Sequence, residues 1–220
     1  MIPGVRLVML GRQGAGKGTQ CVRLSRHYVV PHISTGDMLR AAVKEGTELG
    51  KRASELMAVG DLVPDDVMIG IVEERLDKDD TTRRGYVLDG FPRTVEQADA
   101  LAEITSQRPL DVVIDLDVPE GNVLARLASR RVCADCGANY STDAQPRYGW
   151  VCDNCGGDVI QREDDTPEAI RKRLAEYERK TAPLIAWYRE RQLLEVVDGL
   201  GPPDDVSERL VAIVEKYRQN

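Results

Sequence analysis

Glycines, a lysine and a threonine in residues 11–19 are spaced in a way that suits phosphate binding. The segment reads GRQGAGKGT and matches the Walker A pattern of a glycine, four residues and Gly-Lys. Glycines let backbone N–H groups turn toward phosphate oxygens, and a helix that starts here adds partial positive charge. Lys17 adds a full charge. Gly18 stands where Ser or Thr is usual, so the hydroxyl of Thr19 is displaced by one residue. The loop predicts binding of a nucleoside triphosphate.

A carboxylate and an arginine follow an apolar run in GYVLDGFPR, residues 85–93. Residues 86–88 predict a buried strand that would present Asp89 at its carboxyl end. A carboxylate in this place is typical of a group that holds a metal ion, or its waters, beside nucleotide phosphates. Taken alone, the segment also fits a turn before Gly90 and a solvated helix cap at Arg93.

The segment STGDMLR, residues 34–40, has the residue types of a helix start. Ser34 is a favoured N-cap, and Asp37 is its partner in the first turn. Taken alone, the segment fits a capped helix that exposes Arg40 to solvent.

Four of the five cysteines are paired as Cys133-x2-Cys136 and Cys152-x2-Cys155, with fifteen residues between the pairs. This spacing predicts a tetrathiolate zinc site, and because four thiolates leave no open position, the metal is structural. Iron, redox pairing and disulfides are the alternatives. Cys21 stands alone and is predicted to be a small packed side chain.

An alternating series of elements must hold these segments in place. Strands are predicted at residues 5–10, 28–33, 86–88, 112–116 and 193–197. Helices are predicted at residues 19–27, 38–59, 66–78, 94–105, 119–131, 167–190 and 204–217. The alternation predicts a parallel sheet covered on both faces, with ligands at the carboxyl ends of its strands. Residues 132–160 break the pattern and predict a small inserted module of turns and hairpins.

The composition is that of an ordinary globular chain, with 220 residues, 42% hydrophobic and 30% charged. Every apolar run is shorter than the roughly 20 residues that span a membrane. The first residues lack the pattern of a secretory signal, so we expect a cytoplasmic location. The net charge of −7 argues against nucleic acid as a partner.

In order and content, GAGKGTQ (residues 14–20), STGDMLR and DGFPR followed by Gln97 resemble the adenylate kinase family. Similarity continues over essentially the whole chain, although Gln13 stands where the family usually has proline. The resemblance implies an α/β fold of the P-loop nucleoside monophosphate kinase type. That fold has a five-stranded parallel sheet flanked by helices, with inserted AMP-binding and lid modules. Part of the family carries a lid with four cysteines.

The resemblance also implies a reaction and an organisation. The reaction is reversible, Mg2+-dependent phosphoryl transfer, ATP + AMP = 2 ADP, which keeps adenine nucleotides in balance. The partners are ATP, AMP and ADP, without nucleic acid or membrane, and the cofactors are Mg2+ with ATP and structural Zn2+. By analogy the chain is expected to be a monomer. The core comprises residues 1–33, 67–125 and 165–220, the AMP-binding module residues 34–66, and the zinc-binding lid residues 126–164.

Roles for individual residues follow from the same resemblance. ATP binding falls to Gly14, Ala15, Gly16, Lys17, Gly18, Thr19, Arg126, Arg130 and Gly201. AMP binding falls to Thr35, Arg40, Leu62, Val63, Gly90, Arg93, Gln97, Arg162 and Arg173. Catalysis falls to Lys17, Asp89, Arg93, Arg126, Arg130, Arg162 and Arg173, and the lid metal to Cys133, Cys136, Cys152 and Cys155.

So many arginines suit a reaction between two polyanions. The AMP phosphate is already anionic, so no general base is needed, and His27 and His32 are predicted to be structural. Arg126 and Arg130 are four residues apart and are predicted to share a helix face. Closure of the two inserted modules would exclude water from the reaction.

Two other interpretations stay open. A related kinase would use UMP, CMP or dTMP as acceptor, or GTP as donor; Thr35 and Gln97 favour AMP, because uridylate and cytidylate kinases more often have alanine at the Thr35 position. The other is a zinc-ribbon regulator that binds nucleic acid and uses nucleotide as a switch. The acidic charge counts against it, as does the presence of only one basic residue, Arg147, between Cys136 and Cys152.

Overall fold

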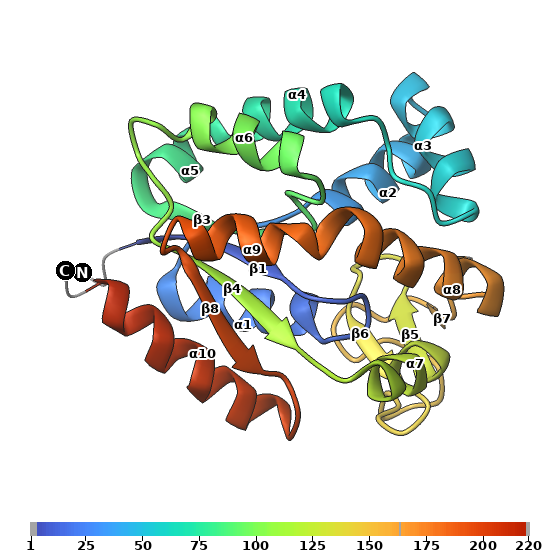
Figure 1. Cartoon of the computed structure of the whole chain (residues 1–220). Helices are drawn as coiled ribbons and strands as arrows, with labels where there is room; N and C mark the ends of the chain where they lie inside the picture. Colours follow the sequence, from blue (N-terminus) through green and yellow to red (C-terminus); the bar gives the residue numbers. More distant parts are fainter. Residues whose placement is uncertain (1–3, 163, 219–220) are drawn as a thin grey trace.

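Parallel strands form the centre of the molecule in the computed structural model, which describes residues 4–162 and 164–218 (Figure 1). The main sheet has five strands in the order β2-β3-β1-β4-β8, and every neighbouring pair is parallel. These strands are β1 (Val5–Leu10), β2 (His32–Ser34), β3 (Gly85–Asp89), β4 (Val112–Asp117) and β8 (Leu194–Asp198). The predicted five-stranded parallel sheet is confirmed.

Both faces of this sheet are buried, so its strands read as nearly continuous apolar runs. On β1, Leu7 and Met9 pack into the cluster formed with α1 (Lys17–Tyr28) and α10 (Pro203–Arg218). Val8 and Leu10, which point the other way, pack with α4 (Asp65–Leu76), α6 (Val95–Ile104) and α9 (Pro183–Glu190). Figure 1 shows these two groups of helices on opposite sides of the sheet.

Two local predictions need correction. The helix predicted at 38–59 is two helices, α2 (Thr35–Glu45) and α3 (Glu48–Ala58). Gly46, with φ 70°, ends the first, and the Thr47 side chain caps the second by accepting from Gly50 N. The strand predicted at 28–33 begins only at residue 32, because α1 continues to residue 28. The short helix α5 (Asp79–Arg84) was not predicted.

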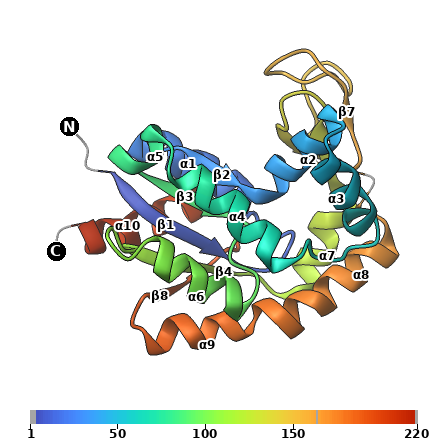
Figure 2. The same cartoon turned by 90° about the horizontal axis from the view of Figure 1, so that it is seen from above.

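A small antiparallel sheet interrupts the alternation. Its strands β5 (Arg130–Cys133), β6 (Asn139–Ser141) and β7 (Val159–Ile160) are arranged in the order β6-β5-β7. In the sequence, these strands lie between α7 (Glu120–Ser129) and α8 (Pro167–Glu176). In space, this part projects from the core beside α2 and α3 (Figure 2). Residues 1–3 and 219–220 of the predicted core, and residue 163 of the predicted lid, lie outside the described residues.

The helical pattern predicted at 167–190 contains an irregular turn. Between α8 and α9 lies a π-helical segment, η1 (Tyr177–Thr181). Such turns insert an extra residue into a helix and are frequent at functional sites. Across the residues that the structure describes, none of the helices combines the length and apolar character needed to span a bilayer.

Candidate active site

The loop between β1 and α1 has the backbone of a phosphate cradle. Gly11, Gly14 and Gly16 have φ values of 132°, 85° and 102°, in the region that favours glycine. A Cβ on Gly14 would lie 2.8 Å from the Leu127 side chain, so only glycine fits this close approach. The loop leads directly into the N-terminus of α1, where free backbone N–H groups favour anions.

Lys17 is the first residue of α1 and folds back over the loop. Its Nζ donates to Gly11 O at 2.7 Å and to Arg12 O at 3.0 Å. Burial lowers the pKa of Lys17; Asp89 opposes this effect and Arg93 reinforces it. The ammonium group is therefore held at the loop in surroundings that favour the arrival of negative charge.

Asp89 ends β3 directly beside this loop. A Cβ placed on Gly18 would lie 3.7 Å from Asp89 Oδ2. The Asp89 side chain is only 13% exposed, and its Oδ2 lies 3.6 Å from His32 Nε2. The structure thus brings together the lysine and the carboxylate that the sequence places 72 residues apart (89 minus 17).

Arg126 links the loop to the segment after β8. Its Nη1 donates to Ala15 O at 2.9 Å and its Nη2 to Gly199 O at 3.2 Å. Gly201 follows in the same segment with φ 107°. Residues of the predicted ATP site from three distant parts of the sequence therefore lie together.

The predicted AMP residues gather around Gly90. Its carbonyl accepts from Thr35 Oγ1 at 2.9 Å and from Arg93 Nε at 2.9 Å. Gln97 Oε1 accepts from Arg93 N at 2.7 Å, and Gln97 Nε2 donates to Asp65 Oδ1 at 2.8 Å. The amide of Gln97 is thereby held in one orientation.

A hollow of about 470 Å³ adjoins this group. It is lined by Leu62, Val63, Pro64, Asp65, Asp66, Thr94, Glu96 and Lys180. Leu62 and Val63, which the family resemblance assigned to AMP binding, are in this lining. At the entry to α2, Arg40 pairs with Asp37, and Ser34 caps the helix as predicted by accepting from Asp37 N at 3.3 Å.

Two aspartates after the small sheet organise further arginines. Arg130 makes a two-pronged contact with Asp165, whose side chain is fully buried, and Arg130 Nε lies 2.8 Å from Oδ2. Arg173 Nη1 lies 2.8 Å from Asp164 Oδ2 and 3.7 Å from Asp165 Oδ1. Paired in this way, the two guanidinium groups are held in fixed orientations.

The expectation that Arg126 and Arg130 share a helix face is wrong. The helix α7 ends at Ser129, and Arg130 has the extended backbone (φ −60°, ψ 136°) of the first residue of β5. Arg126 therefore turns to the phosphate loop, whereas Arg130 turns to Asp165. Arg131, the next residue, lies 5.9 Å from the centre of the Trp150 ring.

The arginines carry more positive charge than the nearby carboxylates offset. Burial lowers the pKa of Arg162 to about 10, and Arg40 and Arg130 reinforce the shift. Burial lowers the pKa of Arg173 to about 10 as well, with a contribution from Arg130. Arg162 Nε is buried and has no hydrogen-bond partner within residues 4–162 and 164–218. Such crowding costs stability but creates a strong site for phosphate oxygens.

Several supporting residues escaped the sequence analysis. Asp65 holds both Gln97 and Thr94, whose Oγ1 lies 2.6 Å from Asp65 Oδ2. Thr181 Oγ1 donates to Arg93 O at 2.9 Å, and Glu178 pairs with Arg12 at 2.8 Å. Asp65 follows a proline, which is the pattern of an ordinary helix start, so its tertiary role was not predictable. The pattern of residues 177–181 likewise does not indicate a π turn.

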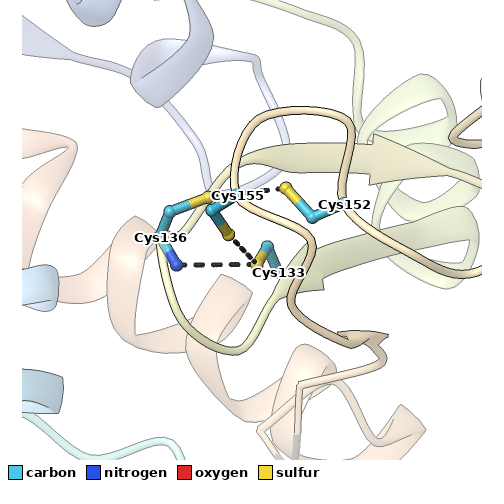
Figure 3. Close-up of side chains that lie close together, drawn as sticks. All are labelled: Cys133, Cys136, Cys152 and Cys155. Atoms are coloured by element: carbon cyan, nitrogen blue, oxygen red, sulfur yellow. Dashed lines mark hydrogen bonds between the residues drawn. The ribbon is translucent and has the colours of Figure 1, made fainter.

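The four paired cysteines converge in the small sheet, as Figure 3 shows. Cys133 and Cys155 have sulfurs 3.4 Å apart, those of Cys136 and Cys152 are 3.5 Å apart, and all four lie within 4.8 Å of one another. A tetrahedron with metal–sulfur bonds of about 2.3 Å has sulfurs roughly 3.8 Å apart. The site is compatible with zinc, and all four cysteines are free thiols.

Groups around the sulfurs favour the thiolate of Cys152, whereas burial and the neighbouring sulfurs outweigh backbone N–H donation and raise the pKa of Cys136 and Cys155. Backbone N–H groups of Cys136 and Asn154 donate to Cys133 and Cys152, at 3.5 and 3.4 Å. The Tyr140 hydroxyl contact, with help from nearby backbone N–H groups, lowers the pKa of Cys152 to about 6. Gly137 and Gly156, with φ 71° and 77°, allow the turn after each pair.

Known proteins match the sequence of this chain over nearly its whole length. The adenylate kinase family model matches residues 9–193. The chain belongs to the adenylate kinase family. It is 51% identical over 213 residues to an adenylate kinase of Citrifermentans bemidjiense, covering 96% of this chain and 99% of that protein. It is 48% identical over 217 residues to one of Archaeoglobus fulgidus, covering 97% and 100%.

Membership of the adenylate kinase family confirms the fold and the enzyme class expected from the sequence motifs. The chain is a nucleoside monophosphate kinase, a phosphotransferase with adenylate kinase function. Adenylate kinases use Mg2+ with ATP, and a structural zinc ion is compatible with the cysteine cluster.

Proposed function

We propose that this enzyme catalyses reversible phosphoryl transfer between ATP and AMP at the junction of the phosphate loop, Asp89 and the arginine cluster. The observation that carries the proposal is the convergence of Lys17, Asp89 and Arg93. Asp89 acts electrostatically on both cations, and Arg93 reinforces the lowered pKa of Lys17. A nucleotide phosphate bound to the loop would meet a second phosphate bound to Arg93.

On the donor side, residues 14–19 would hold the ATP phosphates through backbone N–H groups and the Lys17 ammonium. Arg126 would lie at the same phosphates, because it already binds the Ala15 carbonyl. The adenine of ATP would lie against the segment that contains Gly201. Arg130 would contact the transferred phosphoryl group from the lid side.

On the acceptor side, Arg40, Arg93, Arg162 and Arg173 would bind the AMP phosphate. Thr35, Gly90, Gln97, Leu62 and Val63 would contact its nucleoside. Gln97 has one further N–H beyond the one given to Asp65, so it can donate to a base without giving up that support. The fixed orientation of Gln97 favours a single base over several.

Asp89 is the group that would hold Mg2+, most simply through its waters, since hard oxygen donors suit this ion. Bound there, Mg2+ would neutralise charge on the phosphate oxygens. The protein residues supply positioning and positive charge. The AMP oxygen is the nucleophile and is already anionic, so proton removal is not required. The two nucleotide phosphates repel each other, and the arginines must hold them close together and aligned for transfer.

Closure over the nucleotides would exclude water from the transfer. Residues 34–66 are proposed as the AMP-binding module and residues 126–164 as the lid, both joined to the core formed by the remaining residues. Lys44 Nζ on α2 lies 3.4 Å from Asp135 Oδ1 in the turn between β5 and β6, so the two modules meet in the present structure. Zn2+ bound by the four cysteines would stabilise the lid, which buries few apolar side chains of its own.

The test is ADP formation from ATP with AMP, GMP, UMP, CMP or dTMP as acceptor, each with Mg2+ and with EDTA. We expect metal-dependent turnover with AMP far above the others. Turnover with a pyrimidine monophosphate instead would overturn the roles of Thr35 and Gln97. ATP hydrolysis without acceptor as fast as transfer would contradict closure.

Three further expectations accompany the proposal. A cytoplasmic location would keep the four thiols reduced and able to bind zinc. A monomer would suffice, because every proposed nucleotide contact comes from one chain. Nucleic acid is not a proposed partner, and the overall negative charge would oppose its approach.

A further inference from the structure

Beside the phosphate loop, three side chains with different donor atoms face one another. They are the Cys21 thiol of α1, the His32 imidazole of β2 and the Asp89 carboxylate of β3. One ligand atom from each lies within 4.8 Å of the other two, and His32 Nε2 is 3.6 Å from Asp89 Oδ2. The lid cysteines are a separate group.

The fold places these three side chains together. Ser34 pairs with Asp89 across the parallel strands, and His32 lies two residues before Ser34, so His32 and Asp89 are on the same face of the sheet. Helix α1 covers that face, and Cys21 is one of its fully buried residues. The arrangement therefore depends on secondary structure rather than on mobile loops.

The imidazole is the least explained of the three groups. His32 Nε2 is buried and has no hydrogen-bond partner among the described residues. The distance of 3.6 Å to Asp89 is too long for a hydrogen bond. A buried nitrogen of this kind usually has a partner, because leaving it unsatisfied costs about 1–3 kcal/mol.

We propose that Cys21, His32 and Asp89 form a second metal site that takes a borderline or soft divalent cation such as Zn2+ or Cd2+. Sulfur, nitrogen and oxygen donors suit zinc, whereas Mg2+ prefers oxygen alone. Zinc bonds of about 2.0–2.3 Å place donors roughly 3.3–3.7 Å apart, which small side-chain rotations reach from the present positions. The thiol proton leaves to solvent when the metal binds, and water completes the coordination.

This second site includes Asp89, which is also the proposed Mg2+ ligand. The effect of zinc on activity therefore rests on the proposed function. A zinc ion held by all three groups occupies the carboxylate that the Mg2+–ATP complex needs. The site is then inhibitory and reversible. The lid zinc, in contrast, is bound by four thiolates and stabilises the fold without blocking transfer.

The binding test uses the full chain with its lid zinc in place. Wild type, Cys21→Ala, His32→Asn and His27→Asn are dialysed against buffered Zn2+, and bound zinc is measured per chain. His27 is the other histidine of the chain and is exposed, so His27→Asn is the matched control. We expect wild type and His27→Asn to hold one zinc more than Cys21→Ala and His32→Asn. Equal zinc content in all four folded proteins would overturn the site.

The kinetic test adds Zn2+ to reactions with excess Mg2+–ATP and AMP. Wild type and His27→Asn should be inhibited and should recover when a chelator is added, whereas Cys21→Ala and His32→Asn should resist. Equal inhibition of all four proteins would mean that zinc acts elsewhere and would overturn the inference. If wild type binds the extra zinc but transfers no phosphoryl group even before Zn2+ is added, the proposed function fails while the site stands.

Discussion

Arg162 shows how a single residue can be poorly placed for stability and well placed for chemistry. It is largely buried, its Nε has no hydrogen-bond partner in the part of the chain that the structure describes, and Arg40 and Arg130 both repel it. In the folded protein its pKa is about 10, below the ordinary value of 12.5. Below about pH 10 the Arg162 guanidinium is charged in both the folded and unfolded states. The full free-energy cost of burying this charge therefore opposes folding at neutral pH. The penalty disappears only as the pH rises from about 10 to 12.5.

Replacing this residue should therefore separate stability from activity. We expect Arg162→Met to raise the free energy of unfolding of the nucleotide-free protein by about 1–2 kcal/mol, because a crowded buried charge is removed. Phosphoryl transfer should fall by roughly a thousandfold, as for the loss of an arginine that binds the transferring group. Urea unfolding at pH 7 and steady-state ADP formation measure the two effects. A variant that is less stable than wild type would contradict the crowding argument.

Asp165 offsets part of the positive charge that crowds this cluster of arginines. Its fully buried carboxylate contacts Arg130 in two places and lies near Arg173. In Asp165→Asn the two guanidinium groups lose their shared anion, and we expect the free energy of unfolding to fall by about 3 kcal/mol. Asp204→Asn, which removes the exposed partner of Arg23, is the control and should leave stability unchanged. Similar losses in both variants would rule out burial as the cause.

Among the elements, the π segment η1 connects the two proposed nucleotide sites. Its Glu178 pairs with Arg12 of the phosphate loop, and its Thr181 donates to the Arg93 carbonyl on the AMP side. An extra residue in the helix lets side chains of one short segment reach both sites.

Thr181→Val tests this connection while keeping the side-chain shape. Loss of the hydrogen bond should leave the Arg93 carbonyl without this partner and cost about 1 kcal/mol, or roughly a fivefold rise in the KM for AMP. The KM for ATP should change little. An equal rise in both KM values would show that Thr181 acts on the whole fold rather than on Arg93.

The small antiparallel sheet depends on its cysteines in a different way. Few buried apolar side chains support it, so zinc bound by the four cysteines would supply much of its stability. We expect zinc removal, or Cys152→Ala, to open residues 130–160 to proteolysis while the parallel sheet stays folded, and transfer to fall sharply. Limited proteolysis with mass spectrometry checks this, with Cys21→Ala as the control that keeps the lid intact.

The elements that carry recognisable chemistry were predictable from the sequence. The phosphate loop, the strand before Asp89 and the cysteine pairs each combine residue type with spacing, and the parallel sheet follows from the alternation. The break at Gly46–Thr47 was missed although glycine followed by threonine is a helix stop and start signal. The end of α7 before Arg130 was missed because no glycine or proline marks it. The roles of Asp65, Asp165 and Thr181 depend on tertiary contacts, which local patterns do not contain.

At the scale of the whole molecule, the site is a concentration of positive charge in an acidic protein. Polyanions that bind the folded state alone should stabilise it by about 2.7 kcal/mol at a concentration 100-fold above Kd. We expect thermal unfolding to shift upward with ATP and with AMP, and hardly at all with adenosine, which lacks phosphate. A comparable shift with adenosine would mean that the base, rather than the arginine cluster, provides most of the binding energy.

The strand order also affects how the chain is made. Strand β4 is complete at Asp117, but its partner β8 ends at Asp198, and α10 covers one face of the sheet later still. At about 5–20 residues per second, the ribosome takes roughly 4–16 s to add the intervening 81 residues (198 minus 117). During that time the nascent chain carries an unpaired apolar strand edge. A ribosome that stalls within this interval would therefore hold a chain prone to aggregation, and its fate would depend on chaperones that bind such edges.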